Sequence, residues 1–427
     1  MKLDTIRFLR KYGMYYEDLN FSHNCNALLK EMRLGLKGEP SSVKMVPTYI
    51  DGRNAKTSAG TVIAIDAGGT NFRVALITFD DQQNATIDYF KNYPMPGTLG
   101  HMDKAEFFDT MAKYVAPIID KSDKIGFCFS YPSVITENKD GRLIHFTKGV
   151  DVSGVDGELV GENLLLALKS NGYDSNKKIV VLNDTVATLL AGTTLSPQKK
   201  YYGNVGFILG TGTNLCYVEK NSNITKDPTL KRKGGFTIIN TESGGCDKIS
   251  TGLIDDEFDK TTNNPGEQRL EKMIGGAYQG PIFALLVQKA YEDGLISNKL
   301  ENIGSVTTKD INDFLTDPHI KNTLPDPITN EADRACIYHI AEMLTQRAAK
   351  LAAIKITAAV IMSDSSENPC LPVRVTVDGS TFYKSQVFAS KLQYYIVKYI
   401  NYHLDRYVDI VKGENLTLLG AAVAAQI

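Results

Sequence analysis

Two short glycine-rich segments of this 427-residue chain carry residues that could hold phosphate groups. Between Thr61 and Phe79, two apolar runs flank Gly68-Gly69-Thr70-Asn71, a pattern that predicts a strand, a tight turn and a second strand. Glycines without a Cβ let backbone N–H groups approach an anion closely, and a hydroxyl and an amide follow directly. The same pattern is also typical of a plain hairpin with a Gly-Gly turn, which requires no function.

A second copy of this segment favours phosphate binding. Between Val205 and Glu219, Gly212-Thr213-Asn214 repeats Gly69-Thr70-Asn71 inside another apolar hairpin. Two such loops across a cleft would hold a nucleoside triphosphate from both sides, as in the actin-like ATPase architecture, which this duplication resembles. Asp66, at the end of the first strand, could hold a hydrated Mg²⁺ beside the phosphates. The chain contains neither the Gly-Lys pair of a Walker-type loop nor the His-Arg-Asp and Asp-Phe-Gly triplets of protein kinases.

A candidate general base follows another apolar strand. Residues 178–192 predict a short buried strand that ends in Asn183-Asp184, with Thr185 as the N-cap of the next helix. A kinase that phosphorylates an alcohol requires a carboxylate to accept the hydroxyl proton, and Asp184 is suitably placed for this role. The alternative is that Asp184 only caps the helix.

Three further residues could contact a polyol substrate. Ser130 ends a predicted strand, Lys148 lies in a loop, and Glu242 lies in a glycine-rich turn beyond a strand. A carboxylate such as that of Glu242 accepts strong hydrogen bonds from sugar hydroxyls. Each residue also has an ordinary interpretation, as a turn serine, a solvated lysine or a solvated loop acid.

The overall composition is that of a globular protein that acts on small molecules. Hydrophobic residues make up 43% and charged residues 22%, and the net charge is −2. The longest basic run is Lys231-Arg232-Lys233, so we expect no nucleic-acid partner and no attraction to anionic membranes. The six cysteines lack CxxC spacing, and no apolar run is typical of a signal peptide or a membrane span. We therefore expect reduced thiols and a cytoplasmic location.

Alternating apolar strands and helical segments predict an α/β protein that is long enough for two lobes. The helical spacing predicts a helix over residues 267–293, broken around Gly275-Gly276 and again at Gly280-Pro281. It also predicts long helices over residues 331–362 and a C-terminal helix over residues 416–426.

Taken in order, the motifs of this chain resemble those of the eukaryotic-type hexokinase family over nearly the whole length. They are EMRLGLKGEPSSVKMVPTYI, IDAGGTNFRV, FSYP, TKG, LNDT, GTGTNLCY, INTE, EKMIGGAYQG and VDGS. One such motif would be a weak signal, whereas this many in family order is a specific one. The zinc-bearing cysteine cluster of the ROK sugar kinases, which belong to the same superfamily, is missing.

This resemblance implies an ATP- and Mg²⁺-dependent hexose 6-kinase of glycolysis with a two-lobed, actin-like (ribonuclease H-like) fold. The substrate would be glucose, with mannose or fructose as alternatives. The large domain would comprise residues 1–58 and 185–412 and the small domain residues 59–184, with residues 413–427 forming a helix on the small domain.

The site residues that the resemblance implies fall into two sets. The sugar contacts would be Ser130, Thr147, Lys148, Asn183, Asp184, Asn214 and Glu242, with Asp184 and Lys148 as the catalytic residues. The nucleotide-binding residues would be Asp66, Gly68, Gly69, Thr70, Asn71, Arg73, Gly210, Thr211, Gly212, Thr213, Gly379 and Ser380, with Asp66 beside the metal.

Three positions depart from the family pattern. Phe146 and Ser243 replace two tryptophans, and the segment 416–420 replaces a glycine-serine-glycine motif, so we expect an altered adenine pocket. Pro281 stands where the family has a second sugar-binding glutamate, which leaves the sugar preference open. The competing interpretation is a nucleotide-switched protein of the actin or Hsp70 kind, or a sugar sensor without turnover. The intact Asn183-Asp184, Lys148 and Glu242 favour the enzyme.

The position of Pro281 generates a prediction from sequence. A lost charge-assisted hydrogen bond weakens binding about 10- to 150-fold, so Pro281→Glu should lower the KM for glucose or mannose if no other group compensates. The prediction requires that the helix start after Gly280 tolerates the loss of the proline, a residue that is favoured at a first helical position. Steady-state kinetics across a hexose panel, with thermal melting as the folding control, measures this. A folded variant with an unchanged or higher KM for every hexose would contradict it.

Overall fold

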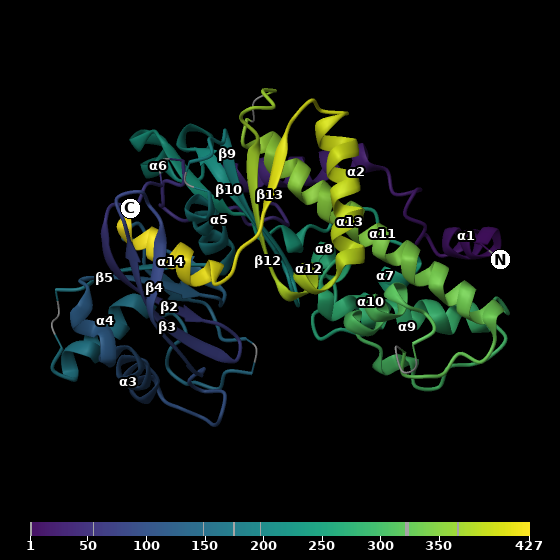
Figure 1. The fold of residues 1–427 in the computed structure, drawn as a ribbon, viewed down its shortest axis with the longest axis horizontal. Helices are drawn as coiled ribbons and strands as arrows, with labels where there is room; N and C mark the ends of the chain where they lie inside the picture. Colours follow the sequence, from purple (N-terminus) through teal and green to yellow (C-terminus); the bar gives the residue numbers. More distant parts are fainter. Residues whose placement is uncertain are drawn as a thin grey trace.

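The computed structural model describes residues 2–53, 55–147, 149–173, 176–196, 198–320, 324–364 and 367–427. Its two main sheets lie in two lobes, side by side along the longest axis of the molecule (Figure 1). The C-terminus lies on the lobe that holds the five-stranded sheet, and the N-terminus lies at the far end of the other lobe (Figure 1).

The sheet of the small lobe has five strands in the order β4-β3-β2-β5-β8. Strands β2, β3 and β4 form an antiparallel meander, and β5 and β8 run parallel to β2. The bounds are β2 Gly60–Ala67, β3 Asn71–Phe79, β4 Ala85–Pro94, β5 Lys124–Phe129 and β8 Lys178–Leu182. The connections include α3 Lys104–Val115, a 3₁₀ helix Ala116–Lys121, the hairpin β6 Ser133–Ile135 and β7 Gly141–Leu143, and α4 Val160–Ser170.

The sheet of the large lobe repeats this plan and adds one edge strand, in the order β1-β11-β10-β9-β12-β13. Strands β9, β10 and β11 form the antiparallel meander, and β12 and β13 run parallel to β9. The bounds are β1 Val46–Pro47, β9 Gly203–Leu209, β10 Thr213–Lys220, β11 Phe236–Asn240, β12 Val373–Asp378 and β13 Val408–Val411. The repeated hairpin in the sequence is therefore the first turn of two lobes with the same strand order, and the predicted two-lobed α/β fold is confirmed.

Most helices lie around the sheet of the large lobe or on the side of that sheet that faces away from the small lobe (Figure 1). Their bounds are α1 Lys2–Lys11, α2 Phe21–Lys37, α6 Pro228–Lys233, α7 Leu253–Lys260, α8 Arg269–Lys272, α9 Gly276–Glu292, α10 Thr308–Thr316, α11 Glu331–Met362, α12 Ser380–Lys384 and α13 Gln386–Tyr395. A π-helical turn, Ile396–Asn401, continues α13. The segment 331–362 is thus one helix of 32 residues.

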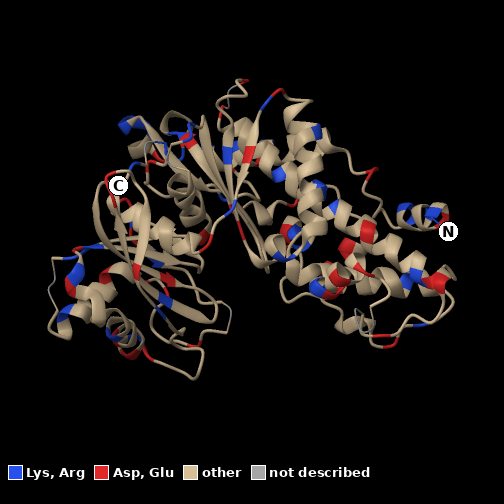
Figure 2. Ribbon diagram, in the orientation of Figure 1, with Lys and Arg blue, Asp and Glu red and all other residues tan. Residues whose placement is uncertain are grey.

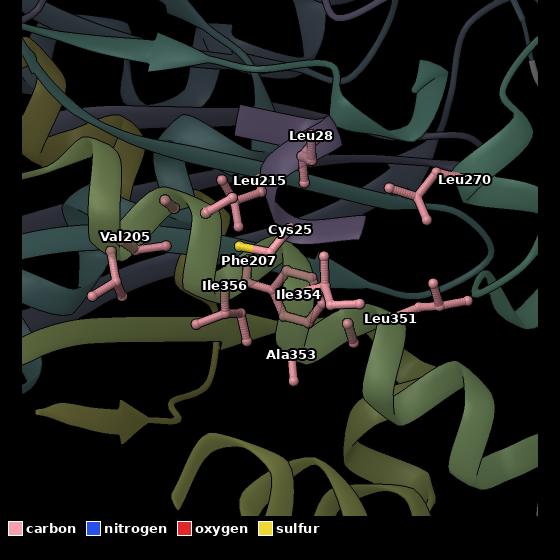
Figure 3. Close-up of a cluster of buried hydrophobic side chains, with 14 of the residues drawn as sticks. Cys25, Leu28, Val205, Phe207, Leu215, Leu270, Leu351, Ala353, Ile354 and Ile356 are labelled. Carbon is pink, nitrogen blue, oxygen red and sulfur yellow. The ribbon is translucent and has the colours of Figure 1, made fainter. Parts of the chain in front are cut away.

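The second half of α11 is buried on all sides, as its alanine-rich and apolar sequence requires. Leu351 and Ile354 of α11 share one core with Phe207 of β9 and Leu215 of β10 (Figure 3). The helix therefore lies directly behind the hairpin that carries the second candidate phosphate loop.

Two helices, α5 Asp184–Leu195 and α14 Leu416–Gln426, form the contact between the lobes. A Cβ on Gly420 of α14 would lie 1.8 Å from the carbonyl oxygen of Ala187 in α5, so only glycine permits this approach. A Cβ on Gly126 of β5 would lie 1.8 Å from the carbonyl oxygen of Ala421, so α14 packs equally closely on the small-lobe sheet. Gly206 of β9 admits α5 to the large-lobe sheet in the same way.

These contacts support the domain division that the sequence indicates. Helix α5 lies against β9 and α14 lies against β5, so we propose that the boundary between residues 59–184 and 185–412 runs at the start of α5. We propose likewise that residues 413–427 belong with the small domain.

Two helix predictions were wrong. Helix α9 begins at Gly276 and contains Pro281, so the proline does not start a helix. The start is set earlier because the N–H groups of Gly276 and Ala277 bond the carbonyls of Gly210 and Thr211. Thr185 is not the N-cap of α5; the cap is Asn183, whose side-chain oxygen accepts the N–H of Thr185 at 2.9 Å.

No helix in the described ranges combines the length and apolar composition that a membrane span needs. Lys and Arg alternate with Asp and Glu along both lobes (Figure 2).

The contact between α5 and α14 generates a stability prediction. Gly420→Val should destabilise the protein by roughly 1–3 kcal/mol or more, because the new side chain meets backbone that cannot turn aside. Gly304→Ala is the matched control, because a Cβ there meets nothing within 4 Å, and its effect should stay within about 0.5 kcal/mol. Denaturant unfolding of both variants measures the difference, and equal stabilities would contradict the proposed packing constraint.

Candidate active site

The first candidate phosphate loop, residues 68–70, joins β2 to β3. Its glycines do not have a left-handed backbone, and a Cβ on Gly68 would meet only the carbonyl oxygen of Asn71, at an ordinary 3.7 Å. Contacts within the chain therefore do not require glycine at position 68. A glycine here would instead leave room for a ligand to approach the backbone. The loop is held in place from one side, because the Tyr131 hydroxyl donates to the Gly68 carbonyl at 2.5 Å.

Asp66 is buried at the end of β2 and forms an ion pair with Arg73, which lies opposite it in the register of β2 and β3. Thr417, in the first turn of α14, joins this pair. Its hydroxyl donates to Oδ2 of Asp66 at 3.1 Å and accepts from Arg73 at 3.1 Å. The C-terminal helix is thereby fastened to the strand pair that carries the first loop.

The second candidate loop, residues 210–213, is held from behind by other elements. The carbonyl of Gly210 accepts the Gly276 N–H and the Thr381 hydroxyl, both at 2.8 Å. Gly379 has a φ of 116°, and a Cβ there would lie 2.3 Å from Leu209, so this position requires glycine. The structure thus places the turn of Gly379 and Ser380 directly against the second loop.

Thr213, the last residue of this loop, is buried, which differs from the arrangement in the first loop. Its N–H donates to Glu271 Oε2 at 2.9 Å, and its hydroxyl accepts from Lys355 at 2.9 Å. Gly212 makes room for the Glu271 carboxylate, because a Cβ there would lie 2.2 Å from Oε2. Thr213 therefore shapes the loop from inside the lobe, whereas Thr211 is exposed on its surface.

Glu242 and Asn214, two candidate sugar contacts, form one hydrogen-bonded cluster with Asn240. The side-chain amides of Asn240 and Asn214 donate to the same oxygen of Glu242, Oε1, at 2.7 and 3.0 Å. Both amides are thus oriented by one carboxylate, and Oε2 keeps its capacity to accept sugar hydroxyls. Burial is the main cause that raises the pKa of Glu242, and the nearby charge of Asp184 raises it further.

Asp184 is the first residue of α5, and Oδ1 accepts the Thr185 N–H at 2.7 Å. Two other carboxylates lie near enough to interact with it, those of Glu242 and Asp378. The pKa of Asp378 is raised by burial first, then by the charges of Asp184 and Asp66. Carboxylates from the ends of three strands, β2, β8 and β12, therefore gather at one place.

Ser130 joins this group from β5, since its N–H donates to the carbonyl of Ala67 at 3.1 Å. Thr147 is half-buried and follows Phe146, whose ring packs edge-on against Tyr131 with centroids 5.3 Å apart. Lys148 lies outside the described residues. Asn183 acts as the N-cap of α5, so its side-chain oxygen is already engaged.

Sequence reasoning missed several residues of this site. Asn240 and Asp378 are the last residues of their strands, and Glu242 and Ser130 come just after strand ends, so the same rule could have identified them. Tyr131 lies in the FSYP motif, but no local pattern indicates its hydrogen bond to Gly68. Thr417 could not have been identified, because its partners lie more than 340 positions away in the sequence and come together only through the packing of α14.

Comparison with known proteins gives the family of this chain. Two family models described as hexokinase match residues 10–194 and 204–427. The chain is 30% identical to a hexokinase of Schistosoma mansoni over 88% of this chain and 87% of that protein. It is also 30% identical to hexokinase-1 of Schizosaccharomyces pombe, over 93% of this chain and 85% of that protein.

Solved structures give the same result. The structure of the Schistosoma mansoni hexokinase complexed with glucose covers all of this chain and 98% of its own, with 27% identity and a TM-score of 0.79. The actin-like, two-lobed fold is therefore confirmed, and by sequence and by fold the chain belongs to the hexokinase family.

Proposed function

We propose that this hexokinase-family enzyme transfers the γ-phosphoryl group of ATP to the 6-hydroxyl of a hexose, as in the first step of glycolysis. The observation that carries the proposal is the convergence of two phosphate loops, the Glu242 cluster and Asp184 at the carboxyl ends of the strands. This edge of an open α/β sheet is where ligands bind.

Asp184 is proposed as the general base that accepts the proton of the attacking hydroxyl. Its carboxylate is oriented by the Thr185 N–H at the start of α5, where the helix dipole favours the ionised form. The same bond suits a helix cap, so the assignment depends on the neighbouring groups. A capping role alone does not explain why Glu242 and Asp378 approach this acid, since like charges disfavour one another.

Glu242 is proposed as the main anchor of the hexose. Asn214 and Asn240 fix the orientation of this side chain, so the carboxylate presents a fixed acceptor to sugar hydroxyls. Ser130, Thr147, Lys148 and Asn183 remain proposed sugar contacts by resemblance. Glucose is the favoured substrate, with mannose and fructose as alternatives.

The residues near the first loop suit ATP with Mg²⁺. In the described part of the chain no group of three or more His, Cys, Asp or Glu side chains forms a metal cage. Mg²⁺ commonly binds to one or two carboxylates together with substrate phosphates, and it keeps several water ligands. A single carboxylate, that of Asp66, could therefore hold the ion through a bound water. When bound, Mg²⁺ would neutralise charge on the phosphates. Loop residues Gly68 to Asn71 and Gly210 to Thr213 would orient those phosphates, with Gly379 and Ser380 on the adenosine side.

The alternative of a nucleotide-switched actin-like or Hsp70-like protein, or of a sensor without turnover, is not favoured. The hydrogen-bonded cluster of Asn214, Asn240 and Glu242 has no part in such a switch, and the family is one of sugar kinases.

The position of Pro281 bears on the sugar preference. Pro281 lines a groove of about 460 Å³ with Phe258, Leu300 and others, none of them a candidate sugar contact. The lowered KM expected from the sequence for Pro281→Glu is therefore not favoured, and we now expect the hexose KM of this variant to be unchanged.

The base assignment predicts the behaviour of Asp184→Ala. The rate constant of phosphoryl transfer should fall by about two to four orders of magnitude, because no group accepts the hydroxyl proton. Nucleotide affinity should change little. Asp184→Asn keeps a helix-capping oxygen and serves as the control for folding. Turnover close to wild type in Asp184→Ala would remove the assignment.

The anchor assignment predicts a pH dependence of hexose binding. The pKa of Glu242 is raised in the folded protein, so its ionised, accepting form is lost as the pH falls through that raised pKa. The hexose KM should therefore rise at acid pH. Glu242→Gln should raise the KM roughly 10-fold or more at neutral pH and remove this part of its pH dependence. An unchanged hexose KM in the variant would exclude the role.

A further inference from the structure

Lys355 lies completely buried in α11, directly behind the second candidate phosphate loop. Its ammonium group donates to the hydroxyl of Thr213 at 2.9 Å, and its Nζ lies 5.7 Å from the centre of the Phe207 ring. Its neighbours on the helix, Ile354 and Ile356, point into the core that packs against β9 and β10 (Figure 3). The Lys355 side chain is therefore packed beside apolar groups, and its ammonium group donates to the Thr213 hydroxyl.

Lys355 forms no ion pair among the described residues, although charged groups lie near it. The titratable groups that face it are Glu271 from α8, Glu242 beyond β11, and Cys246 in the following turn. The first of these bonds the second phosphate loop, and Glu242 belongs to the proposed sugar site. Lys355 thus lies between the two proposed subsites, inside the lobe.

This burial disfavours the charged form of the side chain. Loss of hydration lowers the pKa of Lys355 to about 7, while Glu271, Glu242 and Cys246 act in the opposite direction. An apolar side chain of similar size would avoid that desolvation, so a role in stability alone does not account for a lysine here. Buried charge that weakens a fold is typical of functional sites.

We propose that Lys355 is a positioning residue for phosphoryl transfer, whose ammonium group fixes Thr213 and places a positive charge behind the loop that receives the phosphates of ATP. This inference rests on the proposed function. Glu271 holds the N–H of Thr213 and Lys355 holds its hydroxyl, so together they fix the end of the loop from both sides. The remaining charge of the ammonium group favours an anion in front of the loop.

The first consequence concerns ATP. In Lys355→Met, kcat/KM for ATP should fall about tenfold at about pH 6.5, where wild-type Lys355 is largely protonated. The ratio of wild type to variant should shrink at about pH 8.5, because Lys355 has then lost its positive charge in the wild type, while its neutral amine still donates to the Thr213 hydroxyl. Comparison at each pH cancels the titration of ATP itself. The hexose KM should change little.

The second consequence concerns stability: the substitution that lowers activity should make the folded protein more stable. The pKa of Lys355 in the folded protein lies below the usual lysine value of 10.5, so the unfolded chain binds more protons between about pH 7 and 10.5. The contribution of Lys355 to stability therefore rises with pH in that range. Lys355→Met should therefore raise the melting temperature, most clearly below about pH 7. A variant that is more stable and less active separates positioning from structural support.

Lys350 supplies the matched control on the same helix. It is also buried, and burial lowers its pKa to about 8, but its ammonium group donates to the carbonyl of Tyr16, away from the loop. Lys350→Met should leave kcat/KM for ATP and its pH profile unchanged. A tenfold loss in this control as well would show a general effect of α11 and would overturn the proposal.

The result that overturns the proposal directly is a Lys355→Met enzyme with wild-type kcat/KM for ATP at pH 6.5, or with a loss that is the same at every pH. If this variant fails to fold, Thr213→Val tests the same hydrogen bond from its other end, and normal kinetics for ATP there would contradict the proposal. Wild-type turnover of a hexose tests the proposed function. If it is absent, direct binding of a non-hydrolysable ATP analogue to both proteins still tests Lys355.

Discussion

The arrangement of the whole molecule depends on the close contact between α5 and α14. The two helices begin after the last strands of the two sheets, and they meet where Gly420 lies against the backbone of Ala187. Gly126 and Gly206 let each helix approach its own sheet as closely. Because the helices are fixed in this way, their first turns bring Asp184 and Thr417 to the same edge at which the strands end.

The two lobes share a strand order but support their phosphate loops differently. The first loop is the more exposed of the two at its threonine, its Gly68 is not required by the chain itself, and hydrogen bonds hold the carbonyls of Gly68 and Thr70. The second loop is fixed from inside by Glu271, Lys355 and the start of α9. The second loop thus presents a preorganised surface, which reduces the ordering that binding must impose.

Much of the fold could be predicted from the sequence because the strands are short, apolar and bounded by glycine or polar turns. Helix α14 has the predicted bounds, and the repeated hairpin correctly indicated two related lobes. The start of α9 could not be predicted, because it is set by carbonyls of Gly210 and Thr211 rather than by a local cap. Proline inside that helix was therefore misread as a start.

In the candidate site too, some residues could be predicted from local sequence and others could not. Residues at strand ends, such as Asp66, Asn214 and Glu242, were identifiable because position in the strand pattern indicates where a side chain emerges. Lys355 was not identifiable from the sequence. A lysine within a long alanine-rich helix gives no indication that it contacts a loop far away in the sequence. Such residues become visible only when the packing of α11 behind β9 and β10 is known.

The central claim is that ATP cleavage and hexose phosphorylation are one reaction at this edge of the two lobes. The most direct measurement is ADP release by the purified protein with ATP and Mg²⁺, with and without each of glucose, mannose and fructose, with the product examined by phosphorus NMR. The account predicts ADP release only when a hexose is present, with the phosphate on the primary hydroxyl of the sugar. Equal ADP release without any hexose, and no sugar phosphate, would contradict it.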